Sequence, residues 1–271
     1  MPALRNLTLG RYVPTASVVH GLDPRTKLLA SIGLMVSVLA TPNLPVLGLY
    51  FGFLAVSTRA SRLPAAMLLR NLQAFTWLFL FTIIMHALMT PGTVLLAFPW
   101  WNLTVTREGA HGGLFYGLRL AAVIVTASLL TLTTAPLELT GGLERLLGPL
   151  RRIGVPAHDL ALMITIALRF IPVLIDEAER LRKAQLARGA DFGGGPLRRA
   201  RQMIPLLAPL FISAFDRADR LALAMESRCY RGGEGRTSYH ELRFRRHDLL
   251  AALIATMIGL GITIVPRLLH R

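Results

Sequence analysis

The sequence has very little chemistry for covalent cross-links, metal binding or catalysis. Its single cysteine, Cys229, excludes an intramolecular disulfide. The seven histidines are scattered, without the short paired spacing of zinc sites. The phosphate-binding motif GxxxxGKS/T, the nucleophile elbow GxSxG and the zinc motif HExxH are all missing. We therefore expect no catalytic residue, no metal and no cofactor in this chain.

Acidic residues are also scarce, 15 against 30 Lys and Arg, which leaves a net charge of +15. Such a charge suits either nucleic acid or the anionic cytoplasmic surface of a membrane. Hydrophobic residues make up 53% of the chain and gather in long runs, and no basic patch interleaved with aromatic residues is present. The composition therefore predicts the lipid bilayer as a partner and no nucleic acid.

The apolar runs predict an all-α, polytopic membrane protein with about five transmembrane helices. They cover residues 28–57, 72–90, 114–134 and 249–265, and TPNLP at 41–45 divides the first of them. Each half of that run has about 14 residues, fewer than the ~20 that cross a bilayer upright. We interpret the two halves as a helical hairpin with Pro42 and Pro45 at its turn; a re-entrant loop is the alternative.

Basic residues set the predicted orientation. They precede the first run and separate the second helix from the third, whereas loop 91–112 carries only Arg107. By the positive-inside rule the N-terminus is cytoplasmic, and Phe98, Trp100 and Trp101 form an aromatic belt outside. The chain then divides into a membrane region with about four spans (1–134), a cytoplasmic region (135–247) and a C-terminal transmembrane helix (248–271).

Region 135–247 has the periodicity of long amphipathic helices. Apolar stripes recur three times, and the second and third helices are expected to begin near Pro172 and Pro205. Acid-before-base pairs four residues apart support them: Asp176 with Arg180, Glu179 with Lys183, and Asp216 with Arg220. A solvated domain, or helices lying on lipid headgroups, would explain periodicity alone. Small residues in the stripes and charges of both signs favour a protein partner instead.

Two of these helices finish alike, with QLARGAD at 185–191 and MESRCYR at 225–231. In each, a small residue precedes an arginine, Arg188 or Arg228. An arginine at a helix C-terminus interacts with the negative end of the helix dipole, worth roughly 0.3–1 kcal/mol, and this explains either residue alone. The repetition suggests a second role, since a guanidinium binds a carboxylate of a partner with two hydrogen bonds.

Three long strings carry a resemblance to a known family. They are SVVHGLDPRTKLL at 17–29, TTAPLELTGGLERLLGPLRRIGVPAHDLALMITIALRFIPVLIDEAERLRKAQLARGADF at 133–192, and IPLLAPLFISAFDRADRLALAMESRCYRGG at 204–233. Together they resemble the transmembrane T component of energy-coupling factor (ECF) transporters, which are importers of the ABC class. The resemblance covers nearly the whole chain.

The resemblance implies a non-catalytic scaffold in a prokaryotic plasma membrane. Its long cytoplasmic coupling helices would sit on two ABC-type ATPase subunits, which bind ATP and Mg, and would move a small membrane substrate-binding subunit. The cargo would be a vitamin or a transition-metal ion. Carried over by position, the ATPase contacts are Ala187, Arg188 and Gly189, a full match to the family's Ala-Arg-Gly motif.

The second ATPase contact is a partial match, with Ser227, Arg228 and Cys229 in the three positions. Serine keeps the small size. Cysteine is poorly suited to the left-handed backbone that glycine supplies at a helix end. We therefore expect Gly232 or Gly233 to cap the second helix.

Two rival functions belong to other classes. A membrane-embedded enzyme acting on lipid or isoprenoid would need clustered acidic residues to hold a metal, and the spans offer none. A self-contained secondary transporter would place polar groups at mid-membrane, where the spans carry little beyond His86, which we interpret as a packed polar residue.

Three smaller features have structural interpretations. Arg119, near the start of the fourth span, either snorkels or faces protein. The stretch LDPRTK at 22–27 is expected to order the chain where it enters the membrane, with Arg25 as a cytoplasmic-side anchor. The glycines at 193–195 lack the Lys and Ser/Thr of a phosphate-binding loop and suit a flexible hinge.

Overall fold

The computed structural model describes residues 12–41, 43–98, 103–154, 156–232, 244 and 246–269. The chain splits into two compact units. We call residues 10–142 and 242–271 the membrane unit, and residues 1–9 and 143–241 the long-helix unit. Each is described by itself. The predicted division after residues 134 and 247 concerns the two sides of the bilayer, and it stays a prediction.

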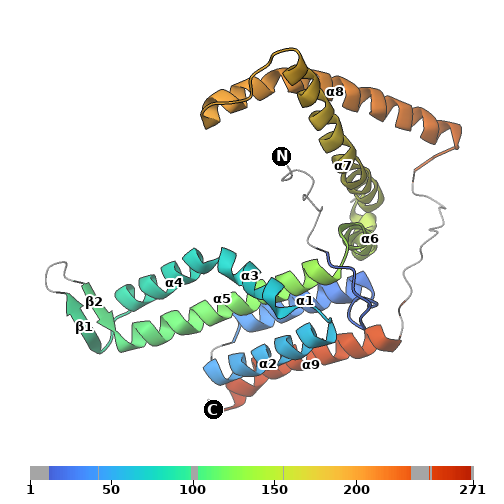
Figure 1. The fold of residues 1–271 in the computed structure, drawn as a ribbon. Coiled ribbons are helices and arrows are strands. Elements are labelled where there is room, and N and C mark those ends of the chain that lie inside the picture. Colours follow the sequence, from blue (N-terminus) through green and yellow to red (C-terminus); the bar gives the residue numbers. More distant parts are fainter. Residues whose placement is uncertain are drawn as a thin grey trace. The chain divides into compact units, whose positions relative to one another are not determined.

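The membrane unit is built from helices and one short β-ribbon (Figure 1). In chain order its elements are α1 (Pro24–Leu39), α2 (Leu44–Ala60), α3 (Ala65–Ala74), α4 (Thr76–Met89), β1 (Val94–Phe98), β2 (Leu103–Thr106), α5 (Arg107–Thr133), the first part of α6 (Pro136–Leu147), and α9 (Arg246–Leu269).

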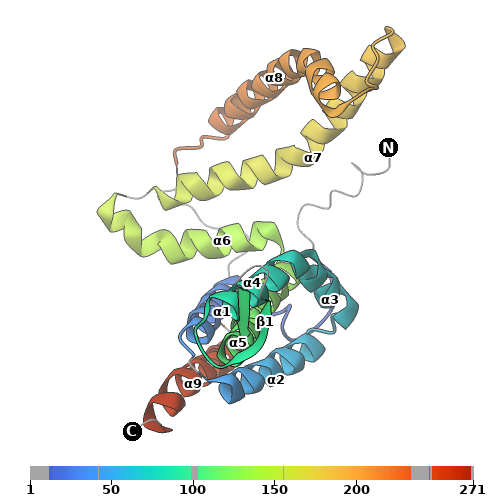
Figure 2. The same ribbon diagram turned by 90° about the vertical axis from the view of Figure 1, so that its left-hand side faces the viewer.

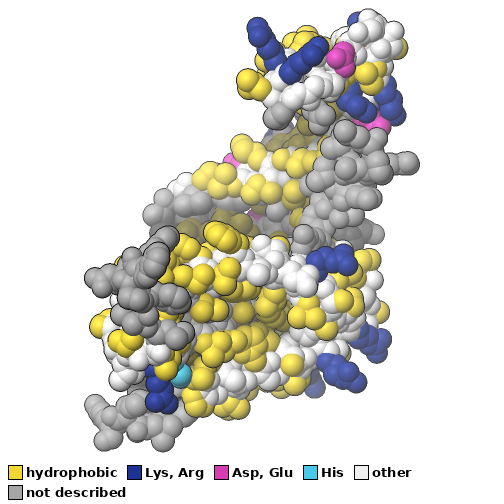
Figure 3. Space-filling model, turned by 60° about the vertical axis from the view of Figure 1, so that its left-hand side comes forward, with side chains coloured by type: hydrophobic (Ala, Val, Ile, Leu, Met, Phe, Trp, Pro, Cys, Tyr) yellow, Lys and Arg dark blue, Asp and Glu magenta, His cyan; other side chains and the backbone are white. Residues whose placement is uncertain are grey.

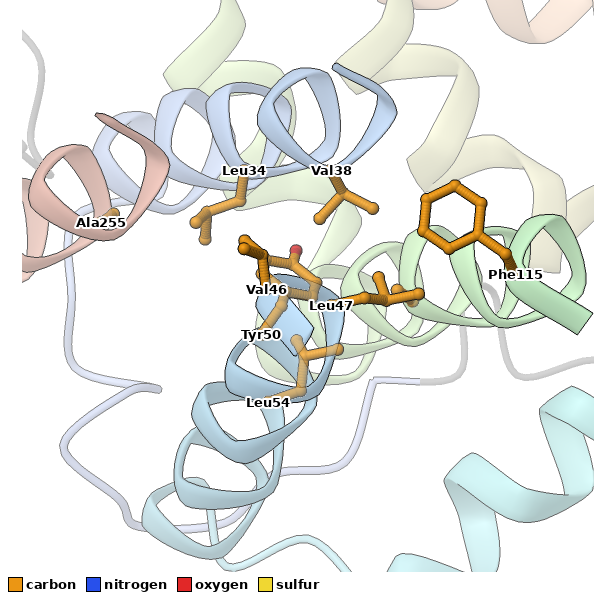
Figure 4. Packing of buried hydrophobic residues seen from close by; sticks show 9 residues of the cluster. Leu34, Val38, Val46, Leu47, Tyr50, Leu54, Phe115 and Ala255 are labelled. Atoms are coloured by element: carbon orange, nitrogen blue, oxygen red, sulfur yellow. The ribbon is translucent and has the colours of Figure 1, made fainter. Parts of the chain in front are cut away.

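Helix α5 is the central element of this unit, because α1, α2, α3 and α4 all pack against it. A buried cluster fills the space between α1, α2, α5 and α9 (Figure 4). Its members are Leu34, Val38, Val46, Leu47, Tyr50, Leu54, Phe115, Ala122 and Ala255. The Tyr50 hydroxyl lies 2.7 Å from Thr126 Oγ1, which satisfies this buried polar group.

Three glycines spaced four residues apart let α5 lie directly against α4. A Cβ atom on Gly109 would be 2.5 Å from the His86 carbonyl oxygen, and one on Gly113 would be 2.8 Å from that of Ile83. Gly117 meets the Ile83 side chain one turn further on. Small residues at this spacing allow close backbone approach between membrane helices. The pattern is visible in the sequence and was missed there.

The first apolar run folds as the two helices α1 and α2, as predicted, with the break at residues 40–43. Pro42 lies outside the described residues. The third run differs from the single span expected. It is broken at Phe75 into α3 and α4, which bend by 58°. Phe75 has φ −104° and ψ 11°, outside the helical range, although no proline is nearby.

The β-ribbon between α4 and α5 was not predicted. β1 and β2 pair antiparallel, with Ala97 opposite Thr104 and an irregularity between Val94 and Leu96. Thr106 ends the ribbon and caps α5, since its hydroxyl accepts a hydrogen bond from the Gly109 amide (3.1 Å). Trp100 and Trp101, expected in an aromatic belt, lie outside the described residues, as does the Phe98 side chain.

Exposed apolar side chains cover much of the membrane unit. Figure 3 shows one face on which they predominate, with Lys and Arg side chains toward its ends. Trp77, Leu49 and Met89 each expose more than three quarters of their surface. In water this surface would be unfavourable, whereas hydrocarbon accommodates it.

The long-helix unit contains the end of α6, a 3₁₀ helix η1 (Gly148–Ile153), α7 (Ala157–Ala187) and α8 (Pro196–Ser227). Helices α7 and α8 pack on each other (Figure 2). The predicted starts were wrong: Pro172 lies inside α7, and Pro205 and Pro209 lie inside α8. A proline lacks the N–H donor and its ring crowds the carbonyl four residues earlier, yet both helices continue through these positions. Pro196 instead occupies the first turn of α8.

By length and composition, two described helices are apolar enough to cross a membrane, α5 and α7, or three if the bent pair of α3 and α4 counts as one. Helix α2 is apolar but shorter. The sequence did not predict α7 as a candidate membrane span, because the charged pairs in its second half indicated an amphipathic helix. Its first half, residues 157–174, has the apolar composition.

Candidate partner-contact site

The end of α7 is closed by a Schellman motif, a common helix termination with a left-handed residue. The Ala190 amide donates to the Gln185 carbonyl (3.0 Å), and the Gly189 amide donates to that of Leu186 (3.0 Å). Gly189 has φ +86°, which a residue without Cβ adopts freely. Arg188 is the last residue before this turn, and its side chain is exposed.

The end of α8 has the same hydrogen bonds. The Tyr230 amide donates to the Met225 carbonyl (3.0 Å), and the Cys229 amide donates to that of Glu226 (2.8 Å). The left-handed residue is Cys229 itself, with φ +57°. The expectation that Gly232 or Gly233 would cap this helix is therefore wrong. The backbone hydrogen bonds fix the turn one residue after Arg228, and Cys229 has to adopt the unfavourable conformation.

Both arginines lie at the surface of the long-helix unit. Arg188 and Arg228 are exposed, as are the small residues before them, Ala187 and Ser227. Among the described residues, no carboxylate lies within ion-pair distance of either guanidinium. Each helix end thus presents an exposed arginine without an ion-pair partner among the described residues.

The structure does not bring the two arginines together. Arg228 lines a cavity of about 730 Å³ with residues from the first half of α7, among them Arg169 and Phe170. Arg188 lies at the other end of α7. Nineteen residues separate positions 169 and 188, about 28 Å of helix at 1.5 Å per residue. The ends of α7 and α8 are therefore well separated along this pair of helices.

The α8 end is tied to the start of α7 by side chains. Tyr230 Oη lies 3.4 Å from His158 Nε2, and His158 Nδ1 lies 2.7 Å from Glu144 Oε1. These contacts link α6, α7 and the residues after α8 within the long-helix unit. At the α7 end, the Gly193 amide donates a hydrogen bond to Asp191 Oδ1 (2.8 Å). Asp191 also forms an ion pair with Arg198 (3.6 Å).

Of the three predicted ion pairs on α7 and α8, the structure forms Glu179 with Lys183, at 3.1 Å. The other two, Asp176 with Arg180 and Asp216 with Arg220, are not within 4.0 Å among the described contacts. Surface pairs of this kind contribute little to stability.

The LDPRTK stretch forms a buried polar cluster in the membrane unit. Asp23 caps α1 by accepting from the Arg25 amide (2.9 Å), and its own amide donates to Asp248 Oδ1 at the start of α9 (2.6 Å). Lys27 Nζ donates to the carbonyls of His20 (2.9 Å) and Thr133 (3.1 Å). Asp23, Lys27 and Asp248 are buried. The stretch therefore orders the chain here, as predicted, by joining α1, α5 and α9.

Other singled-out side chains are held within the chain. The Arg25 guanidinium lies 5.3 Å from the Phe244 ring centroid. Arg119 donates to the Thr41 carbonyl and lies over the rings of Phe115 and Tyr116, so it faces protein. The His86 ring lies 4.5 Å from that of Tyr116, and its Nδ1 lies 2.9 Å from the Thr82 carbonyl.

Burial lowers the pKa of the His20 imidazole from its ordinary value. The described residues contain no group of three His, Cys, Asp or Glu that could hold a metal ion.

The chain is similar to known proteins over most of its length. A family model described as Cobalt transport protein matches residues 15–239. The chain is 49% identical to the energy-coupling factor transporter transmembrane protein EcfT of Acidaminococcus fermentans, with 93% of each chain covered. It is 46% identical to that of Brevibacillus brevis, over 94% of this chain and 96% of the relative.

The protein of the same name from Bacillus subtilis is 42% identical, again over 94% of this chain and 96% of the relative. The family-model match at residues 15–239 spans helices α1 to α8, and the resemblance found in the sequence is confirmed. The chain therefore belongs to the energy-coupling factor transporter transmembrane protein family and is a membrane component of a transport system.

Proposed function

We propose that this chain is the coupling scaffold of an ECF-type importer. The exposed ends of α7 and α8 each bind one ABC-type ATPase subunit, through Arg188 and Arg228. ATP and Mg bind to those partners. The observation that carries the proposal is the repeated helix end: two helices stop with the same hydrogen bonds, and each leaves an exposed arginine without a carboxylate partner among the described residues.

The separation of the two ends supports one contact per ATPase subunit. About 28 Å of helix lies between the two contact points along α7, so a movement of one ATPase relative to the other would change the angle between α7 and α8. This movement would reorient a small substrate-binding membrane subunit and release its cargo inward. The matching family is described as Cobalt transport protein, which favours a transition-metal ion among the cargo classes, with a vitamin as the alternative.

In this proposal the N-terminus and both helix ends are cytoplasmic, following the positive-inside rule. The apolar first half of α7 would then lie against lipid or the substrate-binding subunit, and only its charged second half would extend into the cytoplasm.

The test is co-purification with two ABC ATPases expressed from neighbouring reading frames. Arg188→Glu combined with Arg228→Glu replaces attraction to an acidic surface by repulsion, and we expect the ATPases to be lost and transport to stop. The matched control is Arg180→Glu combined with Arg220→Glu. These exposed arginines lie eight residues before each tip, about 12 Å away along the helix.

We expect the control to assemble and transport normally. If the tip variant also keeps its ATPases and transports at the original rate, the two helix ends are not the coupling contacts.

A further inference from the structure

A second candidate site lies in the membrane unit, far along the sequence from the arginine tips. A groove of about 1030 Å³ runs between α2, α3 and α5. Its lining is mainly aliphatic: Leu54, Leu63, Leu68, Leu69, Leu72 and Val125 contribute to it. Leu69 exposes 60% of its surface, so this groove opens to the outside of the unit.

Two arginines line the same groove. Arg59 is in the last turn of α2, and Arg62 is in the short connection to α3. Both side chains are exposed, and both also line a neighbouring cavity of about 710 Å³ beside Ser17 and His20. One end of an apolar groove is thus bordered by two cations from a single turn.

The turn that carries them is well defined. Arg62 has φ +53°, the left-handed conformation that side chains with a Cβ rarely adopt. Its amide donates to the Arg59 carbonyl (3.1 Å), and the fully buried Ser61 donates its hydroxyl to the Ser57 carbonyl (2.7 Å). Leu63 is buried on the other side of Arg62. A strained residue persists where its neighbours fix it, and strain of this kind clusters at ligand sites.

The described part of the chain shows no counter-ion for these two arginines. The sequence contains no Asp or Glu between Asp23 and Glu108. Among the described residues, no carboxylate lies within ion-pair distance of Arg59 or Arg62. The complementary ligand has an anionic end for the two guanidinium groups and a hydrocarbon body for the aliphatic lining. Basic pockets between membrane helices bind anionic headgroups for this reason.

We propose that this groove binds an anionic phospholipid. The phosphate lies on Arg59 and Arg62, and an acyl chain follows Leu63, Leu68 and Leu72 toward Val125. The site is independent of the contact between the helix tips and the ATPases. It holds α2 and α3 to the side of α5 through a lipid that both helices share.

The test is retention of lipid by the full-length chain, purified in mild detergent with equal amounts of phosphatidylglycerol and phosphatidylcholine, and measured by native mass spectrometry. We expect the unmodified chain to retain phosphatidylglycerol about tenfold better. Arg59→Gln combined with Arg62→Gln should reduce that preference to near equality. Arg70→Gln is the matched control, since Arg70 is exposed on α3 but does not line the groove, and it should keep the preference.

A second variant tests the acyl chain separately. Ala65 lines the groove and is exposed, so Ala65→Phe narrows the groove without opening the core. We expect it to lower retention of phosphatidylglycerol while the arginines remain in place. Soluble glycerol 3-phosphate, which has the phosphate but no acyl chain, should not displace the lipid.

Several results would overturn the proposal. They are equal retention of the two lipids by the unmodified chain, a preference that survives loss of both arginines, full displacement by glycerol 3-phosphate, or displacement by a membrane protein partner that occupies the groove. Helical content and elution volume of each variant establish that it is folded.

Discussion

The ends of α7 and α8, which carry Arg188 and Arg228, have the same backbone hydrogen bonds but differ in the residue at the left-handed position and in the side chains around it. Both use the same pair of hydrogen bonds from the two residues that follow the arginine. At the α7 end the left-handed position holds Gly189, and at the α8 end it holds Cys229. A Cβ on Gly189 would meet nothing within 4 Å, so the difference between the two ends is one of backbone conformation and not of space.

This comparison indicates that the hydrogen-bonded turn fixes the position of the arginine, whether glycine or cysteine occupies the left-handed position. An L-residue in the left-handed region costs about 1–2 kcal/mol. The α8 end tolerates this cost, and it has additional contacts: Tyr230, directly after Cys229, lies beside His158, which pairs with Glu144. At the α7 end the described contacts are local, from Asp191 to the Gly193 amide and to Arg198.

The largest expected effect on assembly comes from reversing the charge of one arginine at a time. If the two ends are equivalent contacts, Arg188→Glu and Arg228→Glu should each lower recovery of the ATPases by about tenfold or more, because a charge pair at an interface is replaced by repulsion. Quantified co-purification at several salt concentrations is the measurement. A strong loss of ATPases for one variant and none for the other would contradict equivalent roles, despite the shared hydrogen bonds.

The next largest effect tests the side-chain contacts at the α8 end. His158→Ala removes the partner of both Tyr230 and Glu144, and we expect it to destabilise the α8 end by about 1–2 kcal/mol, as a broken side-chain network does. Exchange of amide hydrogens, followed by mass spectrometry, should speed up over residues 225–232. The same measurement over residues 185–190 serves as the internal control. Equal acceleration at both ends would contradict the assignment of these contacts to the second end.

The smallest effect concerns the capping residues themselves. Gly189→Ala forces a Cβ into the left-handed region, and we expect a loss of about 1 kcal/mol after the lower entropy of the unfolded chain is counted. Cys229→Gly reverses the comparison, with an expected gain of about 0.5 kcal/mol because glycine's unfolded-state entropy offsets part of the relief. Thermal unfolding in detergent gives the sign of each change. Shifts in the same direction would contradict the common turn.

Much of the fold was predictable because apolar runs and helical periodicity mark the segments that contact hydrocarbon or other helices. The membrane helices, the break between α1 and α2, and the two arginine-tipped ends all follow from runs and repeats in the sequence. The starts of α7 and α8 did not, since Pro172 and Pro205 were interpreted as helix starts although a long helix continues through a single missing donor. The bend at Phe75 has no local signal in the sequence, since neither proline nor glycine stands at the break.

The site was predictable only in part. Arg188 and Arg228 stood out through their matching neighbours, but the left-handed turn at Cys229 did not, because propensity favours glycine and the backbone hydrogen bonds overrode it. The contact between His158 and Tyr230 joins residues 72 positions apart, which local patterns do not report. The Gly109, Gly113 and Gly117 pattern was available and would have predicted the close packing of α4 on α5.

The cysteine at the α8 end has a practical consequence. It is the only cysteine in the chain, it is exposed, and it stands one residue beyond Arg228. A fluorescent or spin label that reacts with thiols would therefore attach to the unaltered protein at Cys229 alone, beside the proposed ATPase contact at Arg228 and not the one at Arg188. Exchanging the residues, with Gly189→Cys and Cys229→Gly, would move the same label to the opposite end, so that each end of the helix pair could be watched in turn while the transporter works.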